Sequence, residues 1–259
     1  MLLTIDAGNT NTVFALIEGD EIINRWRIST LDQRTAEEYM VWISQLMMLE
    51  GKNTKDIDGA IIATVVPQVE FPLTRLCLNY LHVEPLIVGS DGVDLGIEVK
   101  IINPKEVGAD RLVNAVAGND LYGGPMILVD FGTATTFDVV AKDGAYLGGV
   151  ISPGINLSLA ALHQAAAKLP RIAVEAPTKG QAVTGRTTLE AMQSGIFWGY
   201  IGLVEGIVSR IKQEHDIDMK VIATGGLATI FIDHTLAIDE VVVDLTLHGL
   251  RLIYDRNHK

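Results

Sequence analysis

Residues 4–19 read TIDAGNTNTVFALIEG, and residues 128–143 read LVDFGTATTFDVVAKD. When Asp6 is set on Asp130, the two stretches align at an offset of 124 residues, close to half of the chain. Each follows one plan: an apolar strand, Asp-X-Gly, small polar residues and a second apolar strand. Strand–turn–strand units are common, so chance similarity is the alternative. The position of each stretch at the start of its half favours an internal duplication.

The segments after the two hairpins also follow one plan. Apolar periodicity predicts a third strand in each half, followed by helices that alternate with strands. In the first half the expected elements are 21–29, 35–50, 58–64, 71–81, 85–89 and 112–117. In the second half they are 146–151, 155–167, 188–213, 220–224, 228–232, 241–243 and 245–256, with an irregular loop over 169–186. This pattern predicts an α/β protein with two mixed sheets, divided into residues 1–117 and 118–259, around a cleft.

Composition places the chain among proteins with a large apolar core. It has 259 residues, 48% of them hydrophobic, yet no apolar run approaches the ~20 residues of a membrane span. The N-terminus lacks the features of a signal peptide. The single cysteine, Cys77, excludes an intramolecular disulfide, and either a buried structural residue or a reactive thiol fits its position. We therefore expect a cytoplasmic protein without membrane association.

The net charge of −12 opposes binding to nucleic acid. It also repels anionic phosphates. An enzyme that acts on such substrates needs backbone dipoles, metal ions and a few cationic side chains at the site itself.

The two hairpin turns carry the first candidate chemistry. In Asp6–Thr12 (DAGNTNT) a strand delivers a carboxylate to a turn, where glycine permits close approach of a ligand to the backbone. The stretch Asp130–Thr136 (DFGTATT) repeats this with three threonine hydroxyls. Taken singly, each also fits an ordinary polar hairpin turn. Taken together, they predict a clamp for a polyphosphate, with Mg²⁺ held by the carboxylate through water.

Asp110 and Arg111 form a third candidate, because these adjacent charges precede an apolar helix. Asp110 fits either a helix N-cap or the general base of a kinase that acts on a primary alcohol. Arg111 suits a substrate carboxylate or the charge of the transferred phosphate. The glycines of 224–228 (TGGLA) and 149–154 (GVISPG) permit close approach of a ligand or only turn the chain.

In this order and spacing, the motifs resemble type III pantothenate kinase, of the superfamily that includes acetate kinase, sugar kinases, heat-shock chaperones and actin. The resemblance spans essentially the whole chain. It rests on DAGNTNT (6–12), NPKEVGADR (103–111), DFGTATTFD (130–138), YLGGVISPG (146–154), AAKLPR (166–171) and GRTTLEAMQSG (185–195).

The resemblance implies two ribonuclease-H-like domains of the actin-like ATPase fold. It also implies transfer of the γ-phosphate of ATP to the 4′-hydroxyl of pantothenate, the first step of coenzyme A biosynthesis. The cofactors would be Mg²⁺ and a monovalent cation, potassium or ammonium. The family implies a homodimer whose substrate pocket is completed by the partner subunit.

The resemblance also assigns roles to individual residues. Asp110 would accept the proton. Asp6 would lie on the Mg²⁺ side, and Asp130 would help to bind the monovalent cation. The ATP-binding residues would be Asp6, Ala7, Gly8, Asn9, Thr10, Asn11, Thr12, Val13 and Thr133. The pantothenate-binding residues would be Gly108, Ala109, Asp110, Arg111 and Thr188.

One departure concerns Ile101, which stands where the family usually has a substrate-contacting tyrosine. It leaves room for a kinase or phosphohydrolase of the same fold with another substrate. A second rival is a non-catalytic nucleotide sensor. The three intact carboxylates of Asp6, Asp110 and Asp130 argue against a degenerate site.

Overall fold

Five strands form the first sheet of the computed structural model, which describes residues 1–165, 169–178 and 180–258. Their spatial order is β3-β2-β1-β4-β5. The central strand β1 pairs antiparallel with β2 and parallel with β4, so the sheet is mixed. The strands are β1 (Leu2–Ala7), β2 (Asn11–Glu18), β3 (Glu21–Ser29), β4 (Gly59–Thr64) and β5 (Pro85–Ile87).

The second sheet repeats this topology, with the order β10-β9-β6-β7-β8. Its central strand β6 pairs antiparallel with β7 and parallel with β9. The same order and the same directions in both sheets confirm the two mixed sheets predicted from the repeat. The strands are β6 (Met126–Phe131), β7 (Ala134–Val140), β8 (Tyr146–Pro153), β9 (Lys220–Thr224) and β10 (Glu240–Val241).

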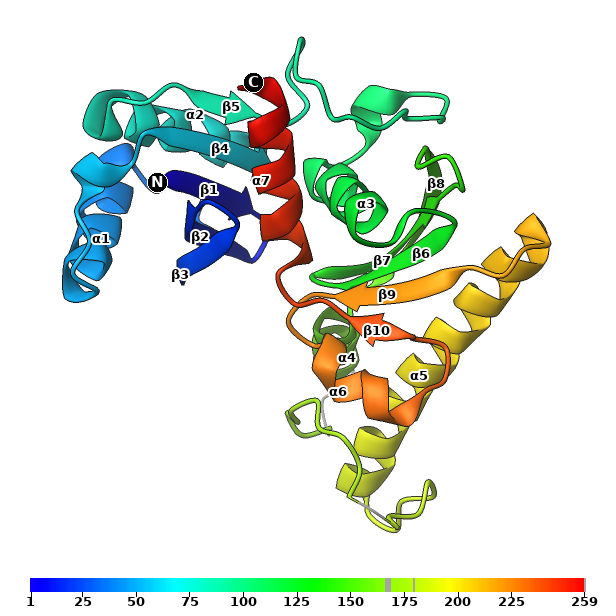
Figure 1. Ribbon diagram of the computed structural model, residues 1–259. Helices are drawn as coiled ribbons and strands as arrows, with labels where there is room; N and C mark the ends of the chain where they lie inside the picture. Colours follow the sequence, from blue (N-terminus) through cyan, green and yellow to red (C-terminus); the bar gives the residue numbers. More distant parts are fainter. Residues whose placement is uncertain (166–168, 179, 259) are drawn as a thin grey trace. The chain divides into compact units, whose positions relative to one another are not determined.

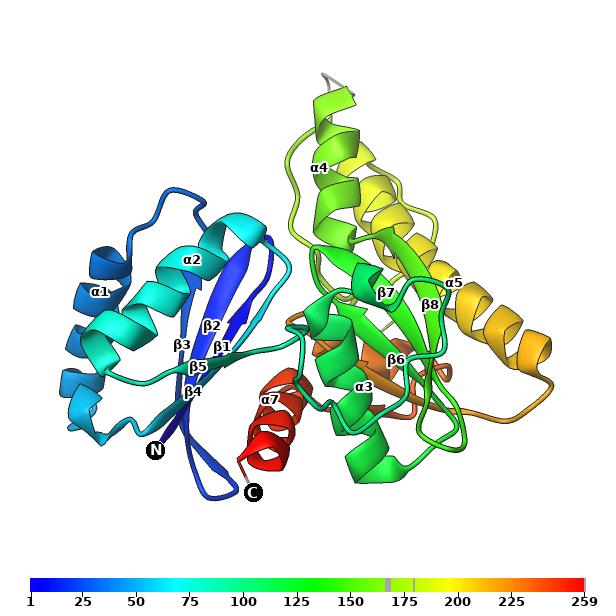
Figure 2. The ribbon, with the colours of Figure 1, turned by 90° about the horizontal axis from the view of Figure 1, so that it is seen from above.

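Helices cover both faces of the first sheet (Figures 1 and 2). Its central strands β1 and β4 are therefore buried on each side. On one face, α1 (Ala36–Leu49) and α2 (Pro67–Arg75) pack against the alternate residues Leu3, Ile5 and Ala7 of β1. On the other face, α7 (Leu245–Asn257) packs on β1 and β4, and apolar residues of α3 (Ala109–Tyr122) belong to the same core.

One face of the second sheet packs on α4 (Ile155–Ala165), α5 (Thr188–His215) and α6 (Ala228–Phe231). Phe131 of β6 stacks on Phe231 of α6 at a ring-centroid distance of 5.1 Å. Such aromatic pairs add to the apolar burial that holds the helices to the sheet.

Two compact units divide the chain: Met1–Asp120 with Leu245–Lys259 form unit 1, and Leu121–Asp244 form unit 2. The predicted division at residues 117 and 118 placed the closing helix in the second half. In the structure α7 packs on β1 and β4, because its apolar residues Leu247, Leu250 and Ile253 enter the core there. The division into two domains stays a prediction, with this difference in the last helix.

Most predicted elements lie within a few residues of the observed ones. The helix expected over 35–50 starts with a capping box, in which the side chains of Thr35 and Glu38 each accept the other's backbone N–H. The helix predicted from residue 71 begins earlier, at Pro67, because proline suits the first helical turn. It continues as a π-helical segment, Leu76–Leu81; 3₁₀ turns occur at Thr54–Asp56, Pro104–Glu106 and Ile232–His234.

Cys77 is fully buried, and burial raises the pKa of its thiol to about 12, so the structural interpretation holds. The loop predicted over 169–186 has no helix or strand in its described residues. Residues 166–168 of the AAKLPR motif and of the helix predicted over 155–167 lie outside the described residues, as does Lys179. Among the described helices, none has the length and apolar content needed to cross a bilayer.

Candidate functional site

The first turn stands at the end of β1. Asp6 is the half-buried penultimate residue of that strand, directly before buried Ala7. The Gly8 N–H donates to the Asn11 carbonyl at 3.0 Å and closes the turn, while Asn9, Thr10 and Asn11 are exposed. The turn therefore presents small polar groups to solvent beside a carboxylate, the arrangement predicted for a phosphate site.

Thr30 holds this turn from outside the motif. Its hydroxyl donates to the Gly8 carbonyl at 2.7 Å, and its backbone N–H donates to the Thr10 carbonyl at 3.0 Å. A third bond joins the Thr30 and Thr12 hydroxyls at 2.9 Å. Sequence reasoning missed Thr30; the one available signal was its place directly after the third strand.

Asp110 lies in the first turn of α3, half-buried. Its Oδ1 accepts the backbone N–H of Arg111 at 2.8 Å, so the carboxylate also stabilises the start of the helix. Burial raises the pKa of Asp110, and the backbone N–H and the charge of Arg111 offset part of that rise. Asp110 is the second residue of α3, so the N-cap interpretation was wrong, and the proton-acceptor interpretation stays a prediction.

Val65 lies beside both Ala7 and Gly108. Its N–H donates to the Ala7 carbonyl at 3.2 Å, beside Asp6. Its Cγ1 lies 3.2 Å from the place that a Cβ on Gly108 would occupy, and that place is only 2.6 Å from Asp110 Oδ1. A side chain at position 108 would therefore displace the Asp110 carboxylate or Val65. In unit 1, Val65 thus lies beside the first turn and beside Gly108, two residues before Asp110.

The second turn packs against a glycine that lies far away in the sequence, Gly225. Asp130 is the half-buried penultimate residue of β6, and Gly225, with φ of +90°, lies against it. A Cβ on Gly225 would lie 2.6 Å from Asp130 Oδ1 and 2.7 Å from the Phe131 carbonyl oxygen. Gly225 therefore packs closely against two oxygens, and a side chain there would push them apart. The Gly154 N–H donates to the Thr133 carbonyl at 3.1 Å.

The two turns differ in length. Pairing joins Ala7 to Thr12 in the first hairpin, but Phe131 to Thr135 in the second. Beyond the turn, residues therefore correspond at an offset of 123 residues. The uniform offset of 124, which sets Thr12 on Thr136, was wrong there. Burial agrees, because Thr12 and Thr135 are both buried. Thr135 also forms a hydrogen bond with the Tyr200 hydroxyl, which sequence reasoning missed.

The predicted site residues belong to both units. Those from 6 to 13 and from 108 to 111, together with half-buried Ile101, lie in unit 1. Asp130, Thr133 and Thr188 lie in unit 2. Thr188 is exposed at the first position of α5, and the neighbouring Thr187 caps that helix by accepting the Glu190 N–H.

No group of three or more His, Cys, Asp or Glu side chains among the described residues could by itself hold a metal ion. A Mg²⁺ ion bound through one carboxylate, substrate phosphates and water does not need such a cage. Asp6 and the turn beside it fit that manner of binding.

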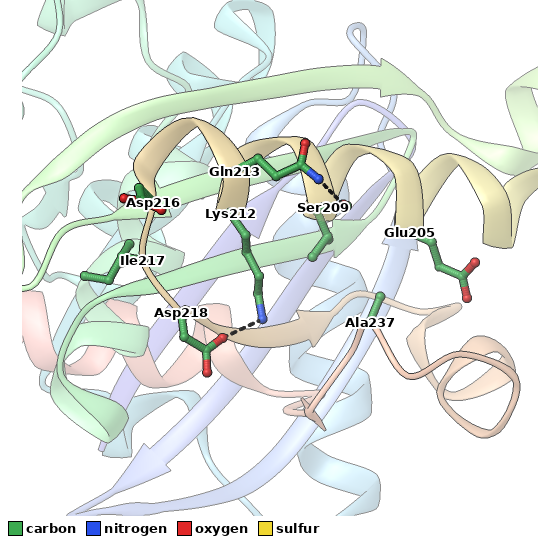
Figure 3. Close-up of a pocket in the computed structure, with 9 residues that line it drawn as sticks. Glu205, Ser209, Lys212, Gln213, Asp216, Ile217, Asp218 and Ala237 are labelled. Carbon is green, nitrogen blue, oxygen red and sulfur yellow. Dashed lines mark hydrogen bonds and ion pairs between the residues drawn. The ribbon is translucent and has the colours of Figure 1, made fainter.

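Figure 3 shows a surface pocket of about 540 Å³ at the end of α5, where Lys212 pairs with Asp218 at 3.1 Å. It is lined by Glu205, Val208, Ser209, Lys212, Gln213, Asp216, Ile217, Asp218 and Ala237. None of the predicted site residues lines it, so it is separate from the two turns.

Comparison with known proteins gives one consistent family. A family model described as type III pantothenate kinase matches residues 2–210. Three relatives with that name align over 257 residues, 99% of this chain. The protein from Paramagnetospirillum magneticum is 59% identical over 98% of its own length. Those from Rhodospirillum rubrum and Caulobacter vibrioides are 55% and 54% identical over 99% and 98% of theirs.

Solved structures similar to this chain show its fold. One, described as a Baf-family transcriptional activator from Campylobacter jejuni, has a TM-score of 0.61 at 19% identity, covering 99% of this chain and 98% of that one. Another, described as a 2-dehydro-3-deoxygalactonokinase from Sinorhizobium meliloti, has a TM-score of 0.58 at 14% sequence identity. That match covers 99% of this chain and 96% of the other. With the duplicated sheets, these likenesses confirm the predicted actin-like ATPase fold of two ribonuclease-H-like units.

Proposed function

The chain belongs to the type III pantothenate kinase family, and from this premise we propose how its residues divide the work of the reaction. The predicted activity, ATP-dependent phosphorylation of pantothenate in coenzyme A biosynthesis, is confirmed by that membership. The transfer needs a proton acceptor, groups that hold the phosphates, and cations that balance their charge.

Asp110 is the proton acceptor in this proposal. The observation that carries it is a partly buried carboxylate in the first turn of α3, beside the charge of Arg111 and in the same unit as the turn that follows Asp6. A partly buried carboxylate with a raised pKa is a stronger base than an exposed one. Asp110 would take the proton of the 4′-hydroxyl and orient its oxygen toward the γ-phosphorus.

The first turn, residues 6–13, and Thr133 of the second turn hold the phosphates of ATP. The exposure of the polar residues Thr10, Asn11 and Thr133 supports this role. The chemistry requires a divalent cation, and we propose Mg²⁺ on the side of Asp6. Bound there with the phosphates, it would neutralise their charge, while Asp6 orients its water ligands.

The monovalent cation, potassium or ammonium, is assigned to Asp130. The nearness of Asp130 Oδ1 and the Phe131 carbonyl oxygen, which both lie against Gly225, supports this assignment, because oxygen atoms are the ligands that such cations take.

Replacing Asp130 with Ala should raise the potassium concentration that gives half-maximal rate by about tenfold, since one charged ligand is lost. The measurement is the initial rate against potassium concentration at constant ionic strength. Asp143→Ala removes an exposed carboxylate of the same unit and is the control. An unchanged potassium response in Asp130→Ala would remove Asp130 from the cation site.

Pantothenate is proposed to contact Gly108, Ala109, Asp110, Arg111 and Thr188, with Ile101 in place of the usual tyrosine.

We also propose a homodimer. The exposed apolar side chains of Ile151 on edge strand β8 and Leu157 on α4 support a subunit interface. The single, buried cysteine supports the proposed cytoplasmic location.

Purified protein supplied with ATP, Mg²⁺, potassium and pantothenate should form ADP and phosphopantothenate in equal amounts. Leaving out pantothenate should stop ADP formation, since the acceptor hydroxyl is then absent. Product analysis by chromatography measures both compounds. ATP binding without phosphopantothenate formation would instead favour the non-catalytic sensor.

A further inference from the structure

The first phosphate turn is held in place by a side chain that does not belong to it. We propose that Thr30 is a positioning residue for ATP, which keeps the turn of residues 8–12 in its phosphate-binding conformation. This inference rests on the proposed role of that turn in binding ATP.

The hydrogen-bond directions fix how Thr30 works. A hydroxyl has one hydrogen, and that of Thr30 donates to the Gly8 carbonyl. The Thr12 hydroxyl must therefore donate to Thr30 Oγ1 across their 2.9 Å contact. With the Thr30 N–H bound to the Thr10 carbonyl, one residue holds three alternate positions of the turn.

The repeat provides an internal comparison. Ser29 pairs with Asn11 and Pro153 pairs with Ala134, so Thr30 corresponds to Gly154. The backbone bond is conserved between the halves, because the Gly154 N–H donates to the Thr133 carbonyl just as Thr30 donates to Thr10.

The side chains at the two positions differ. A Cβ on Gly154 would lie 2.6 Å from the Gly132 carbonyl oxygen and 2.3 Å from that of Thr133. The second turn thus leaves no room for a side chain, whereas the first accommodates a hydroxyl. We call the two hydrogen bonds of the Thr30 hydroxyl, to Gly8 and to Thr12, the side-chain brace. It is a property of the first turn.

Arg34 holds the residue that precedes Thr30. Its Nη1 donates to the Ser29 carbonyl at 2.6 Å, and its guanidinium lies 5.3 Å from the centre of the Tyr39 ring. Tyr39 is fully buried, so the guanidinium is anchored on the core. The end of β3 is therefore fixed at the residue before Thr30.

A preformed turn lowers the entropy cost of ATP binding, because exposed polar residues need not be ordered by the ligand. Without the brace, the groups that contact phosphate remain present but are less often in the binding geometry. The expected defect therefore appears in ATP affinity and leaves the proton acceptor intact.

The test compares Thr30→Val with Thr30→Ser. Valine keeps the shape but loses both hydroxyl bonds, so the KM for ATP should rise about tenfold. The KM for pantothenate and kcat should each change less than about twofold. Serine keeps the hydroxyl and should restore the parent KM. Thr4→Val is the matched control, since Thr4 donates to Ala15 in the same hairpin, away from the turn.

An unchanged KM for ATP in folded Thr30→Val would overturn the inference. So would an equal rise in Thr4→Val, because the effect would then be general loss of stability. If Thr30→Val fails to fold, Arg34→Met replaces it, with an expected rise of two- to threefold in the KM for ATP. No rise there would count against the brace.

Asp6→Asn separates this inference from the proposal on which it rests. If the turn binds ATP, Asp6→Asn weakens ATP-dependent turnover at fixed Mg²⁺ whatever happens at Thr30. A defect in Asp6→Asn with none in Thr30→Val therefore rejects the brace alone. No defect in either variant rejects the ATP role of the turn as well.

Discussion

Replacing Asp110 with Asn should lower kcat by about 10²–10⁴-fold, while the KM for ATP changes by less than about threefold. The amide has the size of the carboxyl, and its oxygen can still accept the Arg111 N–H that now binds Oδ1 at 2.8 Å. The start of α3 therefore persists. What is lost is the group that accepts the hydroxyl proton.

Steady-state rates and ATP titration together check this result. Asp120→Asn is the control, because Asp120 is an exposed carboxylate near the other end of α3, paired with His248. It should turn over pantothenate at the parent rate. Unchanged kcat in Asp110→Asn would remove Asp110 as the base.

The pH dependence gives an independent check on the same residue. The base acts as a carboxylate, so activity is present above its pKa and is lost as the pH falls through it. Because burial raises the pKa of Asp110, this acid limb should lie above the ordinary value for aspartate. The limb should disappear from the residual activity of Asp110→Asn.

Replacing Gly225 with Ala should destabilise unit 2 by about 2–4 kcal/mol and abolish potassium activation. The φ of +90° is unfavourable for a residue with a Cβ. That Cβ would also be pressed to 2.6 Å from Asp130 Oδ1 and 2.7 Å from the Phe131 carbonyl oxygen. The carboxylate must then move out of the place proposed for the cation.

The neighbouring glycine is the control for this second change. A Cβ on Gly226 would have no atom within 4 Å, and its φ is not in the left-handed region. Gly226→Ala should therefore keep both stability and potassium response. Thermal unfolding and potassium titration measure the two effects. Equal behaviour of the two variants would contradict the tight packing around Asp130.

Short-range signals were sufficient for much of the fold. The strand expected over 21–29 coincides with β3, and the capping box of Thr35 and Glu38 is present. Both depend on residues close together in the chain. The same holds for the Asp-X-Gly turns, because a glycine beside a carboxylate is visible in the sequence itself.

Features that depend on tertiary contacts were less accessible. The alignment of the two repeats by residue type assumed turns of equal length. The strand pairing shows that the second turn is shorter than the first by one residue. The packing of α7 on β1 joins the two ends of the chain, which no local pattern indicates. Thr30 and Val65 act through bonds to residues far away in the sequence, so their roles appear only in the folded unit.

Phosphate transfer from ATP to the 4′-hydroxyl of pantothenate is tested most directly by phosphorus–proton correlation NMR of the product. The expected spectrum has one phosphomonoester, coupled to the 4′ methylene protons and formed in step with ADP. A phosphate signal without that coupling, or ADP formed equally fast without pantothenate, would contradict the assignment of this site.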